Sequence, residues 1–272
     1  MAFTQAATIP WTRIKALSFD IFGTLVDWET GIDSTARATA LGPYLPERKQ
    51  FMQALGKIDT VAQRNNPTML QSDVIAEGLR QYAKQINVVQ DGKLTQDQVE
   101  QACKDYGSKI GTYEAFPDTE DAIQRLSKHY KLFPLTNVDN KSFAGTMSHA
   151  LKGCHFDAIY TAEDIGSYKP DAKNFHYLLD HLKSDFGVER GDLVHVAQSL
   201  FHDHGPARDF QLQSVWVNRQ GSRIGAQHDG SWVGAHGEGG EKGEQDVYAF
   251  QLEVKSLGEL AAIVDAAFGV KS

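Results

Sequence analysis

An apolar stretch near the start of this 272-residue chain ends in an aspartate, Asp20, and a glycine–threonine turn, Gly23-Thr24, follows closely. In an open α/β sheet, side chains at the carboxyl ends of the strands face the crevice in which ligands bind. Asp20 is therefore expected to lie beside a ligand, and the Thr24 hydroxyl can bond either this carboxylate or a substrate. A lone Asp-x-x-Gly more often caps a turn, so the assignment depends on further segments.

Three later segments place polar residues where strands are expected to end: Thr136-Asn137, Lys169 and Asp203. The Lys169 ammonium would keep carboxylates ionised when they are brought close together. The hydroxyl of Thr136 and the amide of Asn137 suit the anionic end of a substrate. The sequence thus predicts a single site with Asp20, Lys169 and Asp203 as its catalytic residues.

The elements that must position these residues follow from the hydrophobic pattern, which predicts strands that alternate with helices. The expected strands are 14–19, 130–135, 156–161, 193–197, 213–218 and 247–254. The expected helices that follow them are 117–126, 142–151, 172–184 and 257–268. This alternation predicts an α/β fold with a parallel sheet flanked by helices.

A long helical segment separates the first two expected strands. Apolar residues recur there at the three-to-four spacing of a helix face, and the predicted helices are 46–64, 72–86 and 95–110. The segment is too long for a simple crossover between strands, so we expect an inserted all-helical cap at 29–112. The core would then be discontinuous and consist of residues 1–28 and 113–272.

Composition narrows the classes of protein. The chain is 41% hydrophobic and carries a net charge of −8 without a basic cluster, which argues against a nucleic-acid partner. No apolar run has membrane-spanning length, and the start lacks the pattern of a signal peptide. Cys103 and Cys154 lack metal-type spacing, so we expect free thiols in a reducing compartment and a cytoplasmic location.

Residues 219–245 are rich in glycine and histidine, with little apolar content, and predict a mobile surface loop. Two of the histidines, His228 and His236, raise the question of a metal site. Their spacing is irregular and no further ligands cluster beside them, so we expect no metal there.

The motif Asp-Ile-Phe-Gly-Thr-Leu-Val-Asp at residues 20–27 resembles the first motif of the haloacid dehalogenase-like (HAD) hydrolase superfamily, whose members use the first aspartate as a nucleophile. Lys169, before Pro-Asp, resembles the third motif. The phosphatases of this superfamily carry a second aspartate two positions after the first, as a general acid. Phe22 stands there in this chain and cannot donate a proton, which resembles the 2-haloacid dehalogenase (type II) branch.

The resemblance implies a Rossmann-like core, a helical cap that closes over the site, and a hydrolase similar to (S)-2-haloacid dehalogenases. Asp20 would displace halide from a small 2-haloalkanoic acid and form an aspartyl ester. Water positioned by Asp203 would hydrolyse the ester and release the 2-hydroxy acid. The family also implies a homodimer. The alternatives are a phosphatase of the same fold acting on a small phosphorylated metabolite, and a catalytically altered protein that only binds.

Two further expectations concern the metal and the substrate pocket. Ser199 stands where phosphatases often carry the first of two Mg²⁺-binding acids, so we expect no metal or other cofactor, with a weak Mg²⁺ site as the alternative. The family's cap arginine is replaced by Leu55-Gly56-Lys57, and its Ser-x-Asn pair by Gln198 and Leu200. The candidate replacements for the arginine are Lys57, Arg48 and Arg64. The predicted substrate-binding residues are Ile21, Phe22, Thr24, Thr136, Asn137, Gln198 and Ser199.

Overall fold

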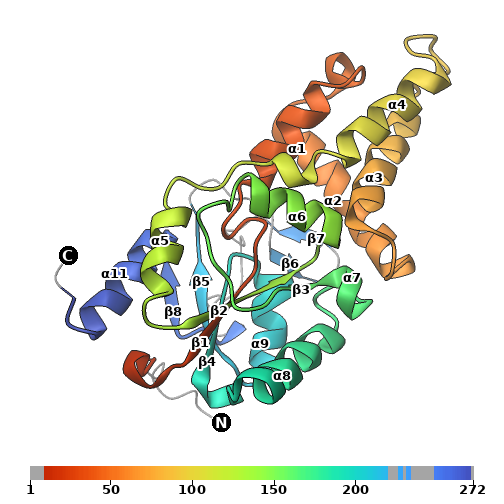
Figure 1. The fold of residues 1–272 in the computed structure, drawn as a ribbon. Coiled ribbons are helices and arrows are strands. Elements are labelled where there is room, and N and C mark those ends of the chain that lie inside the picture. Colours follow the sequence, from red (N-terminus) through yellow and green to blue (C-terminus); the bar gives the residue numbers. More distant parts are fainter. Residues whose placement is uncertain (1–8, 220–225, 229–230, 234–247, 271–272) are drawn as a thin grey trace.

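The computed structural model describes residues 9–219, 226–228, 231–233 and 248–270 (Figure 1). Within these residues, six parallel strands form one sheet in the order β3-β2-β1-β4-β5-β8. The strands are β1 Ala16–Phe19, β2 Lys131–Thr136, β3 Tyr160–Thr161, β4 Leu193–Ala197, β5 Gln213–Val217 and β8 Leu252–Val254. The predicted parallel α/β sheet is confirmed.

Strand alternation sends neighbouring side chains to opposite faces of this sheet, and each face has its own core. In β1, Leu17 and Phe19 belong to one core, whereas Ala16 belongs to the other. Figure 1 shows α5 and α11 on one side of the sheet and α8 and α9 on the other. The helices around the sheet are α5 Thr119–Leu126, α6 Asn140–Ser148, α7 Ala162–Ile165, α8 Ala172–Phe186, α9 Gly205–Asp209 and α11 Leu257–Ala267.

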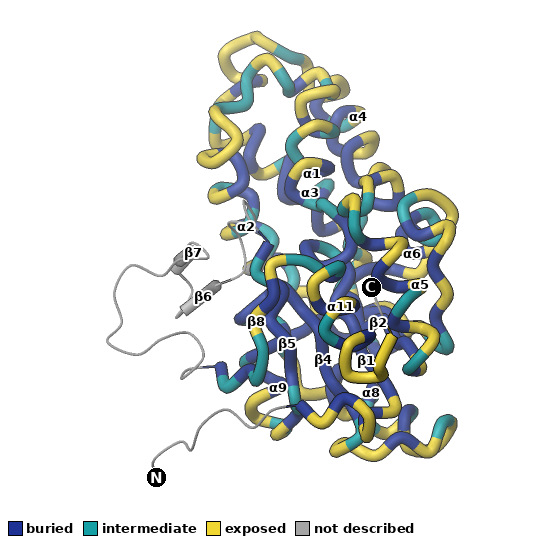
Figure 2. The backbone as a smooth tube through the Cα atoms, turned by 90° about the vertical axis from the view of Figure 1, so that its left-hand side faces the viewer, coloured by how far each residue is buried: buried dark blue, intermediate teal, exposed yellow. Residues whose placement is uncertain are grey.

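The chain between β1 and α5 forms a helical layer that projects beyond the carboxyl ends of the strands (Figure 1). Its helices are α1 Trp28–Arg37, α2 Arg48–Asn65, α3 Gln71–Gln85 and α4 Gln96–Gly107. Figure 2 shows exposed backbone on the outside of this layer and buried backbone between its helices. Residues 29 and 112 as the boundaries of a separate cap domain stay a prediction.

One buried carboxylate joins the helical layer to the core. Asp139 caps α6 by accepting from the backbone N–H of Ser142 at 2.8 Å, and it also accepts from the N–H of Ser72 in α3 at 3.2 Å. Unpaired N–H groups at helix starts favour a carboxylate, and here one side chain serves two helices. α3 is therefore fixed beside the sheet edge that carries the candidate site.

Two strands and one loop differ most from the expectations. β3 is shorter than the predicted 156–161, because the Asp157 side chain itself accepts from the N–H of Leu132 at 2.9 Å, where a longer strand would pair. β8 begins at Leu252 and not at 247. The predicted loop at 219–245 is wrong for two short segments, which form strands.

These two segments are the short strands β6 Ala226–His228 and β7 Ser231–Val233, which pair antiparallel. His228 lies in β6, while His236 lies outside the described residues. Elsewhere, each helix in the described part of the chain is too short or too polar to cross a membrane.

Candidate active site

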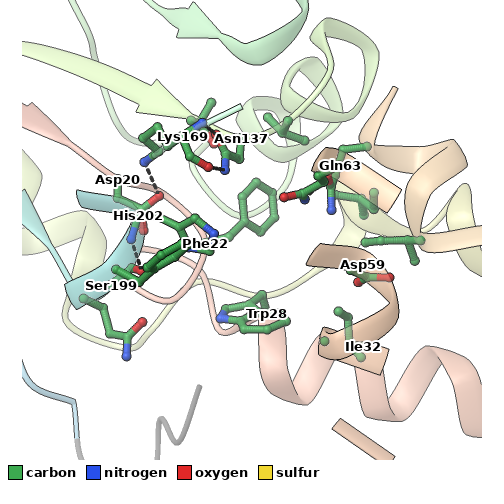
Figure 3. Close-up of a pocket in the computed structure, with 18 of the residues that line it drawn as sticks. Asp20, Phe22, Trp28, Ile32, Asp59, Gln63, Asn137, Lys169, Ser199 and His202 are labelled. Atoms are coloured by element: carbon green, nitrogen blue, oxygen red, sulfur yellow. Dashed lines mark hydrogen bonds and ion pairs between the residues drawn. The ribbon is translucent and has the colours of Figure 1, made fainter. Parts of the chain in front are cut away.

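Residues from three strand ends meet at one edge of the sheet. Asp20 follows β1, Thr136 ends β2 and Gln198 follows β4, and a cavity of about 160 Å³ separates them from the helical layer (Figure 3). The core contributes Asp20, Phe22, Thr136, Asn137, Val138, Lys169, Gln198, Ser199, Phe201, His202 and Asp203 to its lining. The helical layer and its connections contribute Trp28, Ile32, Met52, Leu55, Gly56, Asp59, Gln63, Gln71, Ile75, Ile110 and Tyr113.

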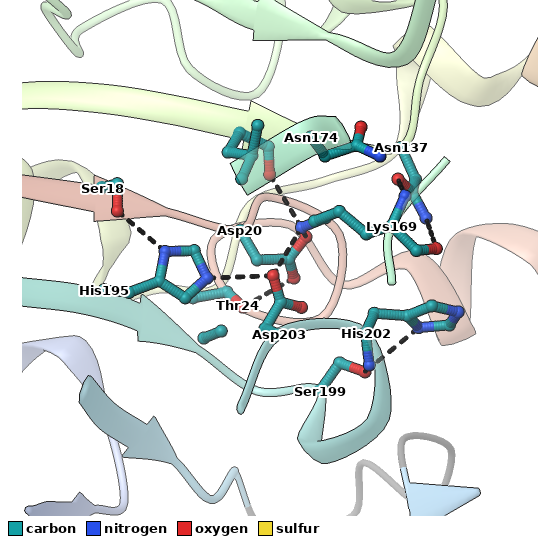
Figure 4. A network of polar contacts seen from close by, with 12 residues as sticks. Ser18, Asp20, Thr24, Asn137, Lys169, Asn174, His195, Ser199, His202 and Asp203 are labelled. Atoms are coloured by element: carbon teal, nitrogen blue, oxygen red, sulfur yellow. Dashed lines mark hydrogen bonds and ion pairs between the residues drawn. The ribbon is translucent and has the colours of Figure 1, made fainter. Parts of the chain in front are cut away.

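The Lys169 ammonium is the centre of the polar network at this edge (Figure 4). It donates to Asp20 Oδ1 at 3.0 Å, to Asp203 Oδ1 at 2.7 Å and to the Leu135 carbonyl at 2.7 Å. Its side chain is only 1% exposed. Each of its three N–H groups therefore has a partner, and the structure brings together the three residues predicted to be catalytic.

Asn137 holds the backbone of Lys169 on both sides. Its Oδ1 accepts from the Lys169 N–H at 2.7 Å, and its Nδ2 donates to the Lys169 carbonyl at 3.0 Å. The sequence predicted that this amide binds substrate. The amide lines the cavity. Through its two bonds to the Lys169 backbone, however, it positions the lysine beside Asp20.

Thr24 orients Asp20 from the opposite side. Its hydroxyl donates to Asp20 Oδ2 at 2.8 Å and accepts from the Gln198 N–H at 2.9 Å. The turn between them needs glycine, because Gly23 has a φ of 99°. Both oxygens of Asp20 are thus held, and its carboxylate has a fixed direction toward the cavity.

The three charges shift each other's protonation. Burial raises the pKa of Asp20 and the Asp203 charge adds to this, although Lys169 opposes both. Burial also disfavours ionised Asp203, but the Lys169 charge and the hydrogen bond from His195 outweigh it and hold the Asp203 pKa well below its usual range. Burial disfavours the Lys169 cation, yet the two carboxylates raise its pKa overall. Asp203 and Lys169 are therefore firmly ionised.

Sequence reasoning missed a buried pair beneath Asp203. His195 Nε2 lies 3.0 Å from Asp203 Oδ1, and its Nδ1 lies 2.8 Å from the Ser18 hydroxyl oxygen (Figure 4). A carboxylate only accepts, so His195 Nε2 donates to it, while Ser18 contacts the other nitrogen of the ring. The available signal was that Ser18 and His195 interrupt two apolar strands at positions that are register partners.

Two buried oxygens at the core end of the cavity have no hydrogen-bond partner among the described atoms. They are Asp203 Oδ2 and the Thr136 hydroxyl, and both residues line the cavity. Buried polar atoms are nearly always bonded, to protein or to ordered water. Both atoms are covered in this structure, so a water molecule or the polar head of a substrate would bond them only after a small local opening.

The two histidines beside Asp203 have different places. His204 is fully buried, with Nε2 3.0 Å from the Ala197 carbonyl, and it joins β4 to β5 through Ser214. His202 lines the cavity, and burial lowers its pKa to about 4. Ser199, which caps this turn, lies 3.1 Å from His202 Nδ1 (Figure 4).

Phe22 forms an apolar wall of the cavity in contact with the helical layer. Its ring meets that of Tyr113 edge-on, with 6.4 Å between the ring centroids. Ile21, predicted to bind substrate, is fully buried in the core and does not line the cavity, because its carbonyl closes the turn after Asp20. Asp27 also lies away from the cavity lining and caps α1 by accepting from Thr30.

The helical layer supplies a carboxyl that sequence reasoning also missed. Asp59 lines the cavity, and burial raises its pKa to about 8. The signal was its position four residues after Leu55, on the helix face that carries the cavity-lining residues of α2. The predicted replacements for the cap arginine, Lys57, Arg48 and Arg64, are exposed and do not line the cavity.

In the described part of the chain, no cluster of three or more histidine, cysteine, aspartate or glutamate side chains is arranged to hold a metal ion. Asp203 is instead bonded to a lysine and a histidine through Oδ1. The predicted independence from metal stays a prediction.

Comparison with known proteins gives consistent matches. The sequence pattern of the family described as haloacid dehalogenase-like hydrolase matches residues 14–197. The (S)-2-haloacid dehalogenase 4A of Burkholderia cepacia is 24% identical over 213 residues, which are 77% of this chain and 85% of that protein.

Solved structures agree in fold. The L-2-haloacid dehalogenase of Xanthobacter autotrophicus with chloropropionic acid covalently bound has a TM-score of 0.67 at 18% identity, covering 92% of this chain and 98% of that one. A HAD-hydrolase of Bacillus subtilis, YfnB, bound to magnesium, has a TM-score of 0.63 at 16% identity, covering 93% and 99%.

We predict that Lys169→Met lowers the free energy of unfolding by about 3–5 kcal/mol at neutral pH, because two buried carboxylates lose their shared cation. Urea unfolding followed by circular dichroism measures this change. Asp20→Asn combined with Lys169→Met should be less destabilised, since only one buried charge is then left unpaired. Equal losses in the single and double variants would contradict the shared-cation arrangement.

We predict that the wild-type protein loses stability relative to Asp59→Asn as the pH rises. The pKa of Asp59 is about 8 in the folded chain and has its ordinary value near 3.8 in the unfolded chain. The unfolded chain therefore releases this proton first, and stability falls between these two values. Thermal unfolding of both proteins at several pH values checks this. A stability difference that stays constant from acidic to alkaline pH would refute the raised pKa.

Proposed function

The chain belongs to the haloacid dehalogenase-like hydrolase family, and from this premise we propose that it hydrolyses a small (S)-2-haloalkanoic acid to the 2-hydroxy acid through an ester on Asp20. The observation that carries the proposal is the geometry of Asp20. Thr24 and Lys169 each bond one oxygen of this carboxylate, and the carboxylate faces the cavity. Phe22, two positions later in the sequence, lines the same cavity.

The first step is a displacement at the substrate's 2-carbon. An oxygen of Asp20 forms a bond to this carbon, and the carbon–halogen bond breaks with its electron pair leaving as halide. Lys169 supports the ionised form of Asp20, and the apolar wall at Phe22 keeps the cavity poor in water. A poorly solvated, oriented carboxylate is a better nucleophile than one in bulk water.

The second step is hydrolysis of the ester. Water adds to the Asp20 carboxyl carbon, and the bond from this carbon to the oxygen now attached to the substrate breaks. The departing alkoxide takes one proton of the water, and Asp20 releases the other to solvent as its carboxylate re-forms. Asp203 Oδ2 has no partner among the described atoms and suits the orientation of this water. Because the Asp203 pKa is well below its usual range, Asp203 passes the proton on and does not keep it.

Several features favour this chemistry over phosphate-ester hydrolysis. Phe22 has no proton to donate to a leaving group, and Asp27, the nearest following acid, is used as the cap of α1. Lys169 and His195 occupy one oxygen of Asp203, while Ser199 replaces a further acid.

The relatives support the same reaction. One relative is an (S)-2-haloacid dehalogenase, and a structure of similar fold holds chloropropionic acid covalently. A cytoplasmic location and a homodimer remain proposals based on the cysteines and on the family.

We predict that the purified protein releases chloride from (S)-2-chloropropionate and that EDTA leaves the rate unchanged. The reason is that, in the two-step scheme, the Lys169 ammonium and not a metal ion supports the ionised form of Asp20. Chloride release is measured with and without EDTA, and p-nitrophenyl phosphate is the comparison substrate. Phosphate release that depends on added Mg²⁺, without chloride release, would favour the phosphatase alternative.

We predict that Asp203→Asn slows hydrolysis of the ester far more than its formation, so that a covalent adduct accumulates on Asp20. The first step needs Asp20 and Lys169, whereas the second also needs the water held by Asp203. Intact-protein mass spectrometry after mixing with (S)-2-chloropropionate detects the adduct. The double variant Asp20→Asn, Asp203→Asn is the control and should stay unmodified. An inactive, unmodified Asp203→Asn protein would mean that Asp203 only fixes Lys169.

A further inference from the structure

The wall of the cavity opposite the nucleophile carries a carboxyl group that the proposed reaction does not use. Figure 3 shows Asp59 and Gln63 on the side of the cavity away from Asp20 and Lys169, with Phe22 and other apolar groups between. The apolar neighbours in this wall are Ile32, Met52, Leu55 and Ile75. Placing a carboxyl group among apolar side chains costs free energy, so we looked for a function that this group could have.

The two oxygens of Asp59 have different surroundings. Oδ1 is covered and has no hydrogen-bond partner among the described atoms. It lies against Gly78 of α3, where a Cβ would be only 2.4 Å away, so glycine makes the room for it. The residue as a whole keeps intermediate exposure and lines the cavity, which leaves Oδ2 as the oxygen that a ligand can reach.

A covered oxygen without a donor is costly for an ionised carboxylate and much less so for a neutral acid. The burial that raises the pKa of Asp59 to about 8 acts in the same direction. The neutral acid has one O–H group. On Oδ1 this group would have no acceptor, because Oδ1 is covered and has no hydrogen-bond partner among the described atoms. The geometry therefore turns Oδ2 into a hydrogen-bond donor that faces the cavity.

The titratable groups around Asp59 are tyrosines. Tyr106 of α4, Tyr113 after the last 3₁₀ turn of the layer and Tyr168 before Lys169 each interact electrostatically with it. Burial raises the pKa of all three, so they stay neutral around pH 8. Asp33, the next acid, interacts with Tyr106. Asp59 is thus the group in this set that changes charge near pH 8.

The other polar groups of this wall are uncharged. Gln63 Nε2 donates to Gln71 Oε1 at 2.9 Å, and both residues line the cavity. The Tyr113 hydroxyl is buried and has no partner among the described atoms. Lys169, at the opposite end, is the one lysine or arginine among the described lining residues. A ligand group that reaches Asp59 meets hydrogen-bonding groups and no cation.

We propose that Asp59 is a specificity-determining residue, which donates a hydrogen bond as a neutral carboxylic acid to an uncharged acceptor oxygen on the far end of the substrate. The substrate class is then a 2-halo monocarboxylic acid whose chain carries a carbonyl-type oxygen several carbons from the reacting carbon. This refinement rests on the proposed function, because the acid head must lie at Asp20. A second carboxylate on the chain would face Asp59 without a counter-charge and is excluded.

The size of the cavity agrees with such a substrate. A water molecule needs roughly 10–15 Å³ of comparable volume, so a cavity of about 160 Å³ has room for on the order of ten non-hydrogen atoms. A three-carbon haloacid has fewer atoms than this and would leave the Asp59 end unfilled.

Three unreactive acids of equal length separate the possible occupants of this end. 5-Oxohexanoate ends in a ketone that only accepts, 5-methylhexanoate ends in an isopropyl group of the same shape, and glutarate ends in a carboxylate. Isothermal titration calorimetry gives their Kd values with the full chain. We expect 5-oxohexanoate to bind most tightly and glutarate most weakly at pH 6.5.

Variants and pH then assign the preference to Asp59. The ratio of the Kd of 5-methylhexanoate to that of 5-oxohexanoate should fall about tenfold in Asp59→Leu, the effect of one hydrogen bond. In the wild type the ratio should also fall as the pH rises through 8, because the donor is lost. Asp59→Asn keeps an N–H donor, so its ratio should stay high and independent of pH. Asp73→Asn, which removes an exposed carboxylate from α3, is the matched control and should behave as the wild type.

Two results would overturn the inference. They are equal ratios in the wild type, Asp59→Leu and Asp59→Asn, and glutarate as the tightest ligand. These binding measurements do not depend on turnover. If (S)-2-chloropropionate and 2-chloro-5-oxohexanoate are both left intact, the proposed function fails, whereas the Kd ratios still decide the role of Asp59.

Discussion

The buried ammonium of Lys169 is the constraint on which the site depends. Asp20 and Asp203 come from different strand ends and would repel each other in a water-poor space. One cation with bonds of 3.0 and 2.7 Å to them makes their approach stable. The surrounding structure serves this cation, since Asn137 fixes its backbone and the Leu135 carbonyl takes its third N–H group. The parallel sheet matters for function because it delivers these groups to one edge.

The two ends of the cavity differ in polarity, because the sheet edge lines one end and the helical layer lines the other. The sheet edge supplies charge, with both oxygens of Asp20 held in a fixed direction. The helical layer supplies apolar side chains and uncharged polar groups, among them Gln63 and Asp59. A monoanionic substrate fits this arrangement with its reacting end toward Lys169. Asp139 bonds the first turns of α3 and α6 and so holds the helical layer in place against the core.

Local sequence signals were sufficient for most of the fold, because short apolar runs that alternate with helical stripes indicate buried parallel strands and flanking helices. The catalytic candidates could be predicted because Asp20 and Asp203 come after apolar strands and Lys169 stands in a motif that resembles the family's third motif. The rest depended on contacts between distant segments. Asn137 contacts Lys169 across the loop, Ser18 meets His195 only through strand register, and the importance of Asp59 arises from burial between α2 and α3. No spacing within one segment carries that information.

In the proposed mechanism, one oxygen of the Asp20 carboxylate becomes the hydroxyl oxygen of the product. Single-turnover reaction of excess protein with (S)-2-chloropropionate in ¹⁸O-labelled water tests this most directly. Hydrolysis at the carboxyl carbon predicts that ¹⁸O appears in the peptide that contains Asp20, while the 2-hydroxy acid carries an unlabelled hydroxyl oxygen from that side chain. Label in the hydroxyl group of the product, with an unlabelled Asp20 peptide, would mean that water attacks the substrate directly and would contradict the account.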